Sequence, residues 1–478
     1  MEFLNDIKNA FLPELIIFIT IILNILLAVI DGKNTLIKAK IINVLAVISA
    51  LISLIFLQIE PNYYSYNNSF VSNLYTILFK ALILVSFLLV ILTSVKIIRE
   101  KRKKSFEYFA VMQSGVLGAL TLISSNDFLS AFVSIEILGL SCYFLSGFRK
   151  NHKSKEASLK YLLTGAVASS LFLFGVSYIY GISGSINFSV INDIYLNSSI
   201  NLLFIVSSFF ILIGLLFKIG SIPFNNWIID VYEGSNYTIC AYISLIPKMA
   251  AAAFISRLFV FIFNFSPVIQ LILAFFAVIS IIYASIGAIH QTNIKRLYAY
   301  SSIIHSGFIL LALSVVNVYS ISSVIFYIIT YIFMNIGIWC ASAIYNNEYN
   351  TDEISDYKGL FYKNPYFSIA LIIFLFSLAG IPPTSGFLAK LYIFTAIIRG
   401  DLIFILLLIF ALIALVISLA VYIKVIKELF EKSQTGIYIK GKYLMQKIIL
   451  YSLALITIII CIVPDIFIKI SQIAAYYI

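Results

Sequence analysis

The chain has 478 residues, of which 62% are hydrophobic and 11% charged, with a formal net charge of +11 and a mean hydropathy of +1.05. Soluble chains carry about 25% charged residues, so this composition excludes a set of soluble domains and indicates a polytopic helical membrane protein. Short basic loops alternate with loops that lack lysine and arginine, which is the positive-inside pattern and argues against a nucleic-acid ligand.

Apolar runs of about 20 residues recur along the whole sequence, and each is expected to form one membrane-spanning helix. The runs lie at residues 11–30, 40–59, 73–95, 107–124, 127–147, 157–181, 200–220, 238–263, 267–289, 298–315, 319–345, 365–400, 402–425 and 447–470. They predict an all-α protein with about fourteen transmembrane helices in one integral membrane domain. No signal peptide is expected, because the first run follows acidic residues and has no small-residue cleavage site. When the basic loops are placed on the cytoplasmic side, both termini are expected to lie on the outer side of the membrane.

Four ionisable residues are predicted to lie deep inside spans, where a charge is costly and is functional by default. They are Glu136 in the fifth span, Lys218 in the seventh, Lys248 in the eighth and Lys390 in the twelfth. One acid for three bases leaves lysines without carboxylate partners, and burial then favours reversible proton exchange. The alternative is a set of structural ion pairs that hold helices together.

Other charged residues lie nearer the ends of spans. Lys80, Lys160 and Arg257 are close enough to helix ends for their side chains to snorkel to the interface. Glu14 follows Pro13 near the membrane surface, and the sequence gives it no role.

Cysteine and histidine are too few and too scattered to form a redox centre. The cysteines stand singly in apolar surroundings, at Cys142, Cys240, Cys340 and Cys461. The absence of a CxxC pair argues against an iron–sulfur or zinc site, and packing in the core is the simpler interpretation. Of the three histidines, His152 lies in a basic loop, and His290 and His305 are isolated. The sequence therefore predicts no metal site and no bound cofactor in this chain.

Two spans contain helix breakers beside a deep lysine. The stretch "KIGSIPFNNW" begins at Lys218, and "LAGIPPTSGFLAK" ends at Lys390. A broken helix frees backbone groups that a membrane tolerates only where protein or water surrounds them. We therefore expect helices 7 and 12 to be discontinuous, and we place a similar breaker, Pro247, before Lys248 in the eighth span.

The two broken spans also indicate an internal repeat. Each has a small residue followed by Ile-Pro next to a lysine, and the two spans are an odd number of spans apart, so their helices run in opposite directions. Inverted repeats with broken helices are typical of ion translocators. We predict an N-terminal three-helix segment at 1–106, two inverted five-helix repeats at 107–263 and 267–430, and a final helix at 447–470.

Several motifs resemble one family of membrane proteins. They are "SIEILGLSCYFLSGFRK", "EASLKYLLTGAVASSLFLFG", "FKIGSIPFNNWIIDVYEGS", "SLIPKMAAA", "HQTNIKRLYAYSSIIHSGF" and "LAGIPPTSGFLAKLYIF". Together they are similar to the antiporter-like subunits of bacterial proton-pumping NADH–quinone oxidoreductase, respiratory complex I, and within that family to subunit N. The motifs extend from the fifth to the twelfth span.

The resemblance implies roles in proton translocation for the deep charges. Glu136 is then the paired glutamate and Lys218 its partner, while Lys248 is the connecting site and Lys390 the exit-side site. Lys160, in the "LKY" motif, joins this set with less support. His305, which otherwise fits a packed core position, belongs by the same resemblance to a central hydrated path.

The resemblance also implies the setting in which the chain works. NADH, FMN, the iron–sulfur clusters and quinone belong to other subunits, so this chain moves protons without redox chemistry. Its partners are the other membrane subunits, of the L, M, K, J, A and H types, in the bacterial inner membrane. Three alternatives stay open: a subunit of a sodium/proton antiporter or membrane-bound hydrogenase, a free-standing solute transporter, and a scaffold whose charges join helices.

Overall fold

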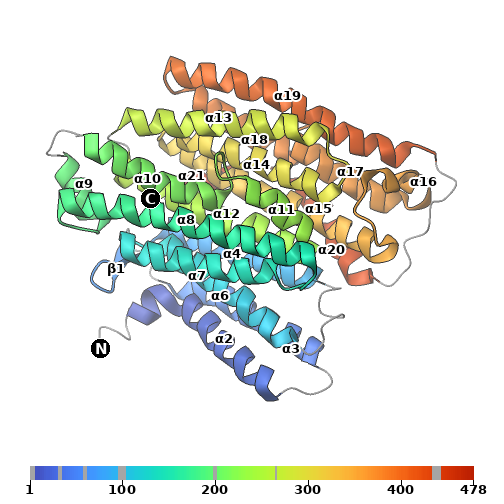
Figure 1. Ribbon diagram of the computed structural model, residues 1–478, viewed down its shortest axis with the longest axis horizontal. Coiled ribbons are helices and arrows are strands. Elements are labelled where there is room, and N and C mark those ends of the chain that lie inside the picture. The colour runs from blue at the N-terminus through green and yellow to red at the C-terminus, as the bar shows by residue number, and fades with distance from the viewer. Residues whose placement is uncertain are drawn as a thin grey trace. The chain divides into compact units, whose positions relative to one another are not determined.

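The structure is a computed structural model that describes residues 6–30, 35–57, 62–94, 104–196, 202–263, 266–432 and 443–478. Within these ranges the chain consists of helices and one two-stranded hairpin (Figure 1). It forms two compact units. One comprises Met1–Ile219, Gly234–Leu271 and Ile473–Ile478, and the other comprises Gly220–Glu233 and Ile272–Gln472.

The first unit contains most of the N-terminal half. Its elements are a π-helix at Ile7–Phe11, α2 (Leu12–Ile30), α3 (Thr35–Ser53), a 3-10 turn at Leu54–Phe56, β1 (Tyr63–Ser65), β2 (Phe70–Ser72), α4 (Leu74–Thr93), α6 (Ser105–Ser124), α7 (Phe128–Ser146), α8 (His152–Ser183), α9 (Phe188–Leu196), α10 (Leu202–Ile219) and α12 (Tyr237–Phe261). The two strands pair antiparallel, with Tyr64 opposite Val71.

The second unit contains most of the C-terminal half. Its elements, in whole or for the greater part, are α11 (Asn226–Gly234), α13 (Pro267–Ile289), α14 (Ile294–Leu313), α15 (Val318–Tyr349), a 3-10 turn at Ile354–Tyr357, α16 (Leu360–Lys363), α17 (Pro365–Ala379), α18 (Ser385–Ile398), α19 (Leu402–Phe430), α20 (Leu444–Ile462) and α21 (Asp465–Ala475).

The predicted fold class is confirmed. Among the described residues, thirteen helices are long and apolar enough to cross a membrane. The run predicted at 365–400 is divided between two shorter apolar helices, α17 and α18. The thirteen long helices and this broken span together account for the fourteen spans expected from the sequence. The division into an N-terminal segment at 1–106, two repeats at 107–263 and 267–430, and a final helix at 447–470 stays a prediction.

Asparagine and aspartate begin several of these helices. The side chains of Asn73, Asp127, Asn151, Asn293 and Asn317 each accept a hydrogen bond from a backbone amide in the first turn of the helix that follows. The first amides of a helix have no partner within it, so such a residue stabilises the helix start by about 1 kcal/mol. These polar residues therefore fix where the apolar runs enter their helices.

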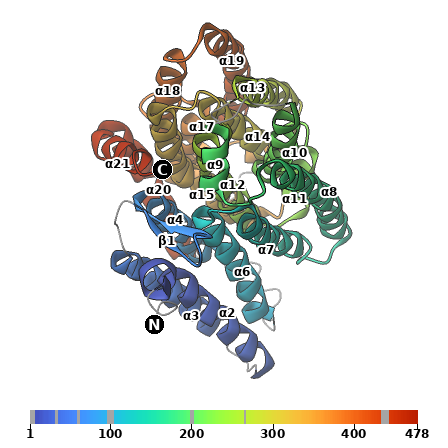
Figure 2. The same cartoon turned by 90° about the vertical axis from the view of Figure 1, so that its left-hand side faces the viewer.

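Helix α12 is the buried centre of the first unit, and it packs against α4, α6, α7 and α10. The run Ala250–Ala253 gives it a narrow surface, because small residues let membrane helices approach closely. Two tyrosine hydroxyls join it to its neighbours. Tyr75 of α4 donates to the Ala253 carbonyl at 3.0 Å, and Tyr242 of α12 donates to the Met112 carbonyl at 2.8 Å. Figure 2 shows α6 and α7 side by side in this unit.

Lys80 does not snorkel to an interface, so that expectation from the sequence is wrong. Its side chain is wholly buried and forms an ion pair with Glu14 at 2.7 Å, and Nζ also donates to the Ala10 carbonyl at 3.1 Å. The Phe11 ring lies 5.6 Å from the same ammonium group. Glu14, to which the sequence gave no role, therefore ties α2 to α4.

Arg257 is also buried rather than extended to an interface. Its guanidinium donates to the Ile123 carbonyl at 3.2 Å, to the Ser125 carbonyl and to the Asn126 side chain at 3.0 Å. These groups lie in the last turn of α6 and in the connection from α6 to α7. The arginine therefore satisfies the free carbonyls at the end of α6, where a cation is also favoured by the helix dipole.

We expect Glu14→Gln to lower the free energy of unfolding by about 3 kcal/mol, because it leaves the buried Lys80 charge without its counter-ion. Thermal unfolding of the purified protein in detergent measures this effect. The control is Glu431→Gln, which removes an ion pair with Lys358 between two well-exposed side chains at 3.3 Å. Equal midpoints for the two variants would contradict the structural role of the Glu14–Lys80 pair.

Candidate functional site

Lys218 occupies the last turn of α10 and is buried, with 3% of its surface exposed. Its Nζ donates to the Tyr143 hydroxyl of α7 at 3.3 Å and lies 5.4 Å from the centre of the same ring. A second ring, that of Phe217, lies 5.6 Å away. Tyrosine therefore gives this ammonium group both a hydrogen-bond acceptor and an aromatic face.

Glu136 lies on α7 near Lys218, but the two do not form a direct ion pair. Its carboxylate accepts a hydrogen bond from the Ser169 hydroxyl of α8, and it interacts electrostatically with Lys218. The ion pairs found among the described residues do not include Lys218. The structure thus brings the two predicted residues into one cluster and places a tyrosine in direct contact with the lysine.

Two glycines make room for this cluster. A Cβ atom at Gly139 would lie 2.4 Å from Lys218 Nζ, so the ammonium group occupies the space that a side chain would fill. A Cβ atom at Gly165 of α8 would lie 1.9 Å from the Tyr143 hydroxyl oxygen. Tyr143 was not predicted from the sequence, although its position carries a signal. It lies seven residues after Glu136, a spacing that puts both on one face of a helix.

Lys248 lies on α12, and its side chain is also 3% exposed. The preceding Pro247 was expected to break this span, but α12 continues through it from Tyr237 to Phe261. Proline has no amide hydrogen, so the Ile243 carbonyl loses its usual helical donor. The predicted breaker therefore weakens the helix at one position next to Lys248 without interrupting it.

Lys160 is not brought into the cluster of Glu136 and Lys218. It lies on α8 with about half of its side chain exposed, and it forms an ion pair with Glu156 one turn earlier at 2.8 Å. Its neighbour Tyr161 is buried instead and packs edge-on against Tyr143, with ring centres 4.6 Å apart. A role for Lys160 in translocation stays a prediction.

His305 lies on α14 in the second unit and is buried among tyrosines. Its Nδ1 atom shares a hydrogen bond with the Tyr327 hydroxyl of α15, and the Tyr331 ring lies 5.0 Å away. One helical turn earlier, the Ser301 hydroxyl shares a hydrogen bond of 2.6 Å with the Tyr422 hydroxyl of α19. Polar side chains therefore follow one face of α14 over two successive turns.

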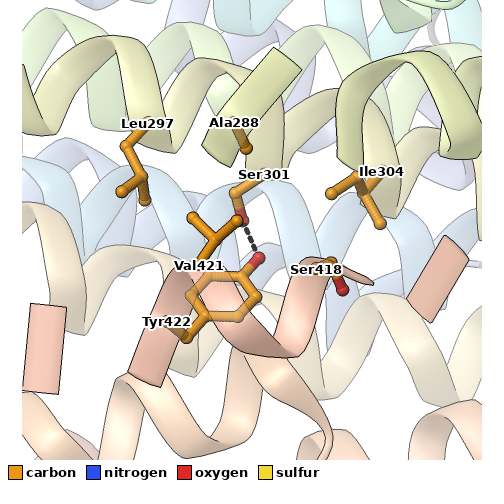
Figure 3. A pocket seen from close by; sticks show the side chains of 7 residues that line it. All are labelled: Ala288, Leu297, Ser301, Ile304, Ser418, Val421 and Tyr422. Carbon is orange, nitrogen blue, oxygen red and sulfur yellow. Dashed lines mark hydrogen bonds between the residues drawn. The ribbon is translucent and has the colours of Figure 1, made fainter. Parts of the chain in front are cut away.

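A small pocket opens beside this polar face (Figure 3). Its lining residues come from α13, α14 and α19, and are Ala288, Leu297, Ser301, Ile304, Ser418, Val421 and Tyr422. Figure 3 shows the Tyr422 hydroxyl pointing toward Ser301, with apolar side chains around the pair. The tyrosines of α15 and α19 were not predicted, because α15 and α19 are far from His305 in the sequence.

The side chain of Lys390 binds the C-terminal end of α17, the helix that precedes the break. Helix α17 ends at Ala379, and Lys390 lies on α18 beyond the break. Its Nζ donates to the Leu378 carbonyl at 2.7 Å and to the Ala379 carbonyl at 2.9 Å. The last carbonyls of a helix have no partner within it and carry partial negative charge. From the sequence, water or protein was expected to surround the backbone groups freed by the break. In the structure, the ammonium group of Lys390 binds two of these carbonyls.

The breaks predicted in the seventh and twelfth spans follow α10 and α17, and they have the same local geometry. Gly220 and Gly380 follow the last residues of α10 and α17, with φ angles of 77° and 82°. Both values are positive, and glycine adopts this region without the clash that a Cβ causes. Each break also contains a cis X-Pro bond, at Ile222–Pro223 and Pro382–Pro383. The two predicted discontinuous helices are therefore present.

The described residues contain no group of three or more His, Cys, Asp or Glu side chains placed to hold a metal ion. Besides Glu136 and His305, the ionisable groups of the candidate site are lysines, and Lys218 and Lys390 have neutral hydrogen-bond partners and aromatic neighbours. These features define a multi-pass membrane protein with buried cations at two helix breaks.

Comparison with known proteins assigns this class to a family. The family model described as "NADH:quinone oxidoreductase/Mrp antiporter, TM" matches residues 125–418, and the chain belongs to that family. The chain is 37% identical to NADH-quinone oxidoreductase subunit N of Pelagibacter ubique over 91% of this chain and 92% of that protein. It is 35% identical to NAD(P)H-quinone oxidoreductase subunit 2 of Gloeobacter violaceus over 88% of this chain and 82% of that one.

A solved structure shows the same fold. One chain of respiratory complex I from Thermus thermophilus with bound aureothin superposes with a TM-score of 0.81 over 96% of this chain and 98% of that chain, at 24% identity. The resemblance noted in the sequence motifs is therefore confirmed at the level of family and fold.

We expect Gly386→Ala to lower the free energy of unfolding by about 1–3 kcal/mol, because an added Cβ would lie 1.9 Å from the Ser377 carbonyl oxygen. This oxygen is backbone, so helices α17 and α18 must move apart. Thermal unfolding of the purified protein measures the change. Gly181→Ala on α8 is the control, since a Cβ there has no heavy atom within 4 Å. Unchanged midpoints in both variants would contradict the close packing at this break.

Proposed function

We propose that this chain is the N-type proton-translocating membrane subunit of an NADH–quinone oxidoreductase, respiratory complex I. The observation that carries the proposal is the burial of Lys218, Lys248 and Lys390 inside the part of the chain that matches the family. Intramembrane charges of this kind are costly to retain and mark ion pathways. The names of the relatives from Pelagibacter ubique and Gloeobacter violaceus support the quinone oxidoreductase assignment.

In the proposed mechanism, Lys218 holds a proton that Glu136 stabilises through its negative charge. A nearby charge in a medium of low dielectric constant can change the energy of an ammonium group by several kcal/mol. A conformational change that moves Lys218 away from the carboxylate weakens this stabilisation, and the proton then passes to Lys248. The chain's own residues thus couple a change in distance to a change in proton affinity.

Lys390 is the proposed release site of the second unit. Its ammonium group binds the carbonyls of Leu378 and Ala379, and Phe308 covers it at 5.5 Å. His305 and its tyrosine neighbours form a second polar group in the same unit, which we propose as a relay toward Lys390. Lys160 is proposed as an auxiliary site, with weaker support because its partner is the exposed Glu156.

The remaining parts of the reaction are proposed to lie in other subunits. NADH, FMN, iron–sulfur clusters and quinone supply and accept the electrons there, while this chain binds no cofactor. The proposed partners are the L-, M-, K-, J-, A- and H-type membrane subunits of the complex. The proposed location is the bacterial inner membrane with both termini on the periplasmic side, which the distribution of basic loops supports.

A second function is a subunit of a sodium/proton antiporter complex. It is favoured by the description of the matching family, which includes the Mrp antiporter as well as the oxidoreductase. The two functions differ in their energy source, because only the oxidoreductase couples proton movement to oxidation of NADH. Purification of the native complex and assay of NADH–quinone activity separates them.

We expect Glu136→Gln to reduce NADH-driven proton pumping by about tenfold or more while the complex still assembles, because the change removes the charge and keeps the shape. Inverted membrane vesicles with a pH-sensitive dye report the pumping rate. Glu107→Gln, which changes a half-exposed carboxylate paired with Lys104, serves as the control. Pumping and quinone reduction at wild-type rates in Glu136→Gln would refute the role of this carboxylate.

A further inference from the structure

The Lys218 ammonium group sits between two side chains of α7. Glu136 lies three residues before Gly139, and Tyr143 lies four residues after it, so the three residues form one stripe on the helix. The head of Lys218 occupies the space above Gly139, where a Cβ would lie 2.4 Å from Nζ. Along the helix axis, Glu136 and Tyr143 are each about one turn, roughly 5 Å, from Gly139.

The two flanking groups offer the lysine different partners. Glu136 carries a carboxylate, which stabilises the charged ammonium form. Tyr143 carries a neutral hydroxyl, which accepts a hydrogen bond from either form of the lysine and can also donate one. In the structure Lys218 contacts Tyr143 at 3.3 Å, while Glu136 is occupied by the Ser169 hydroxyl.

We propose that Tyr143 is a positioning residue, the second partner of Lys218, and that the lysine alternates between Glu136 and Tyr143 through the space above Gly139. This proposal deepens the proposed function, on which it rests. At Glu136 the lysine retains its proton, and at Tyr143 it is held without a counter-charge and can pass the proton on. A buried polar group without any partner is costly, so the tyrosine makes the second position accessible.

The surroundings of Tyr143 are built to keep its hydroxyl in place. The ring packs edge-on against Tyr161, and Gly165 of α8 leaves the space that the hydroxyl fills. Three titratable groups of α7 interact with Lys218, namely Glu136, Cys142 and Tyr143. The Cys142 thiol is only a weak hydrogen-bond acceptor, so the hydroxyl of Tyr143 and the carboxylate of Glu136 are the two groups among these that compete for the lysine.

Tyr143→Phe tests the proposal, since it keeps the ring and removes the hydroxyl. We expect proton pumping by the assembled complex to fall by about tenfold, the effect of losing one hydrogen bond to a charged group. In a cryo-EM structure of this variant, Lys218 Nζ is expected to lie within ion-pair distance of Glu136. Tyr108→Phe is the matched control, because the Tyr108 hydroxyl is buried and has no hydrogen-bond partner among the described residues.

Two outcomes would overturn the proposal. One is a pumping rate in Tyr143→Phe equal to that of the wild type, and the other is a Lys218 side chain that stays above Gly139 away from Glu136, as a purely structural role of the tyrosine predicts. Glu136→Gln, measured in parallel, separates this failure from that of the proposed function. If Glu136→Gln is impaired and Tyr143→Phe is not, only the role of the tyrosine is wrong, whereas normal pumping in Glu136→Gln removes the basis of both.

Discussion

The fold depends on one constraint: a cation enclosed by membrane helices needs a polar partner supplied by the protein. Four buried cations meet this need with three kinds of partner. Lys80 has a carboxylate, Arg257 has the carbonyls at the end of α6, Lys390 has the carbonyls at the end of α17, and Lys218 has a tyrosine hydroxyl. The helix end created by the break after α17 is therefore a binding site for a cation.

The type of partner distinguishes structural from mobile charges. The Glu14–Lys80 pair is wholly enclosed and short, at 2.7 Å, so both charges are fixed by their mutual attraction. Lys218 is held at 3.3 Å by a neutral hydroxyl and lies near a carboxylate that another residue occupies. The proposed function requires that a lysine held in this way exchange partners at small cost.

Local patterns predicted much of this molecule. Hydropathy located the spans, because the length of an apolar run shows whether it can cross the membrane. The Gly-Ser-Ile-Pro and Gly-Ile-Pro-Pro sequences located both breaks, because glycine and proline act on the backbone within a few residues. Partners across helices could not be predicted in this way. The pairing of Lys80 with Glu14 and the contact of Lys218 with Tyr143 depend on how helices pack, so sequence position near a helix end gave Lys80 and Arg257 the wrong surroundings.

The buried lysines are proposed to carry protons, and substitutions of Lys390 give the sharpest test. Lys390→Arg keeps a cation that can bind the Leu378 and Ala379 carbonyls, but a guanidinium group does not release its proton. Lys390→Met loses both properties. Proton pumping per NADH oxidised is the measurement, with thermal unfolding as the check on structure. We expect the arginine variant to unfold near the wild-type temperature and to fail to pump through this subunit. Pumping at the wild-type rate and stoichiometry in Lys390→Arg would contradict it.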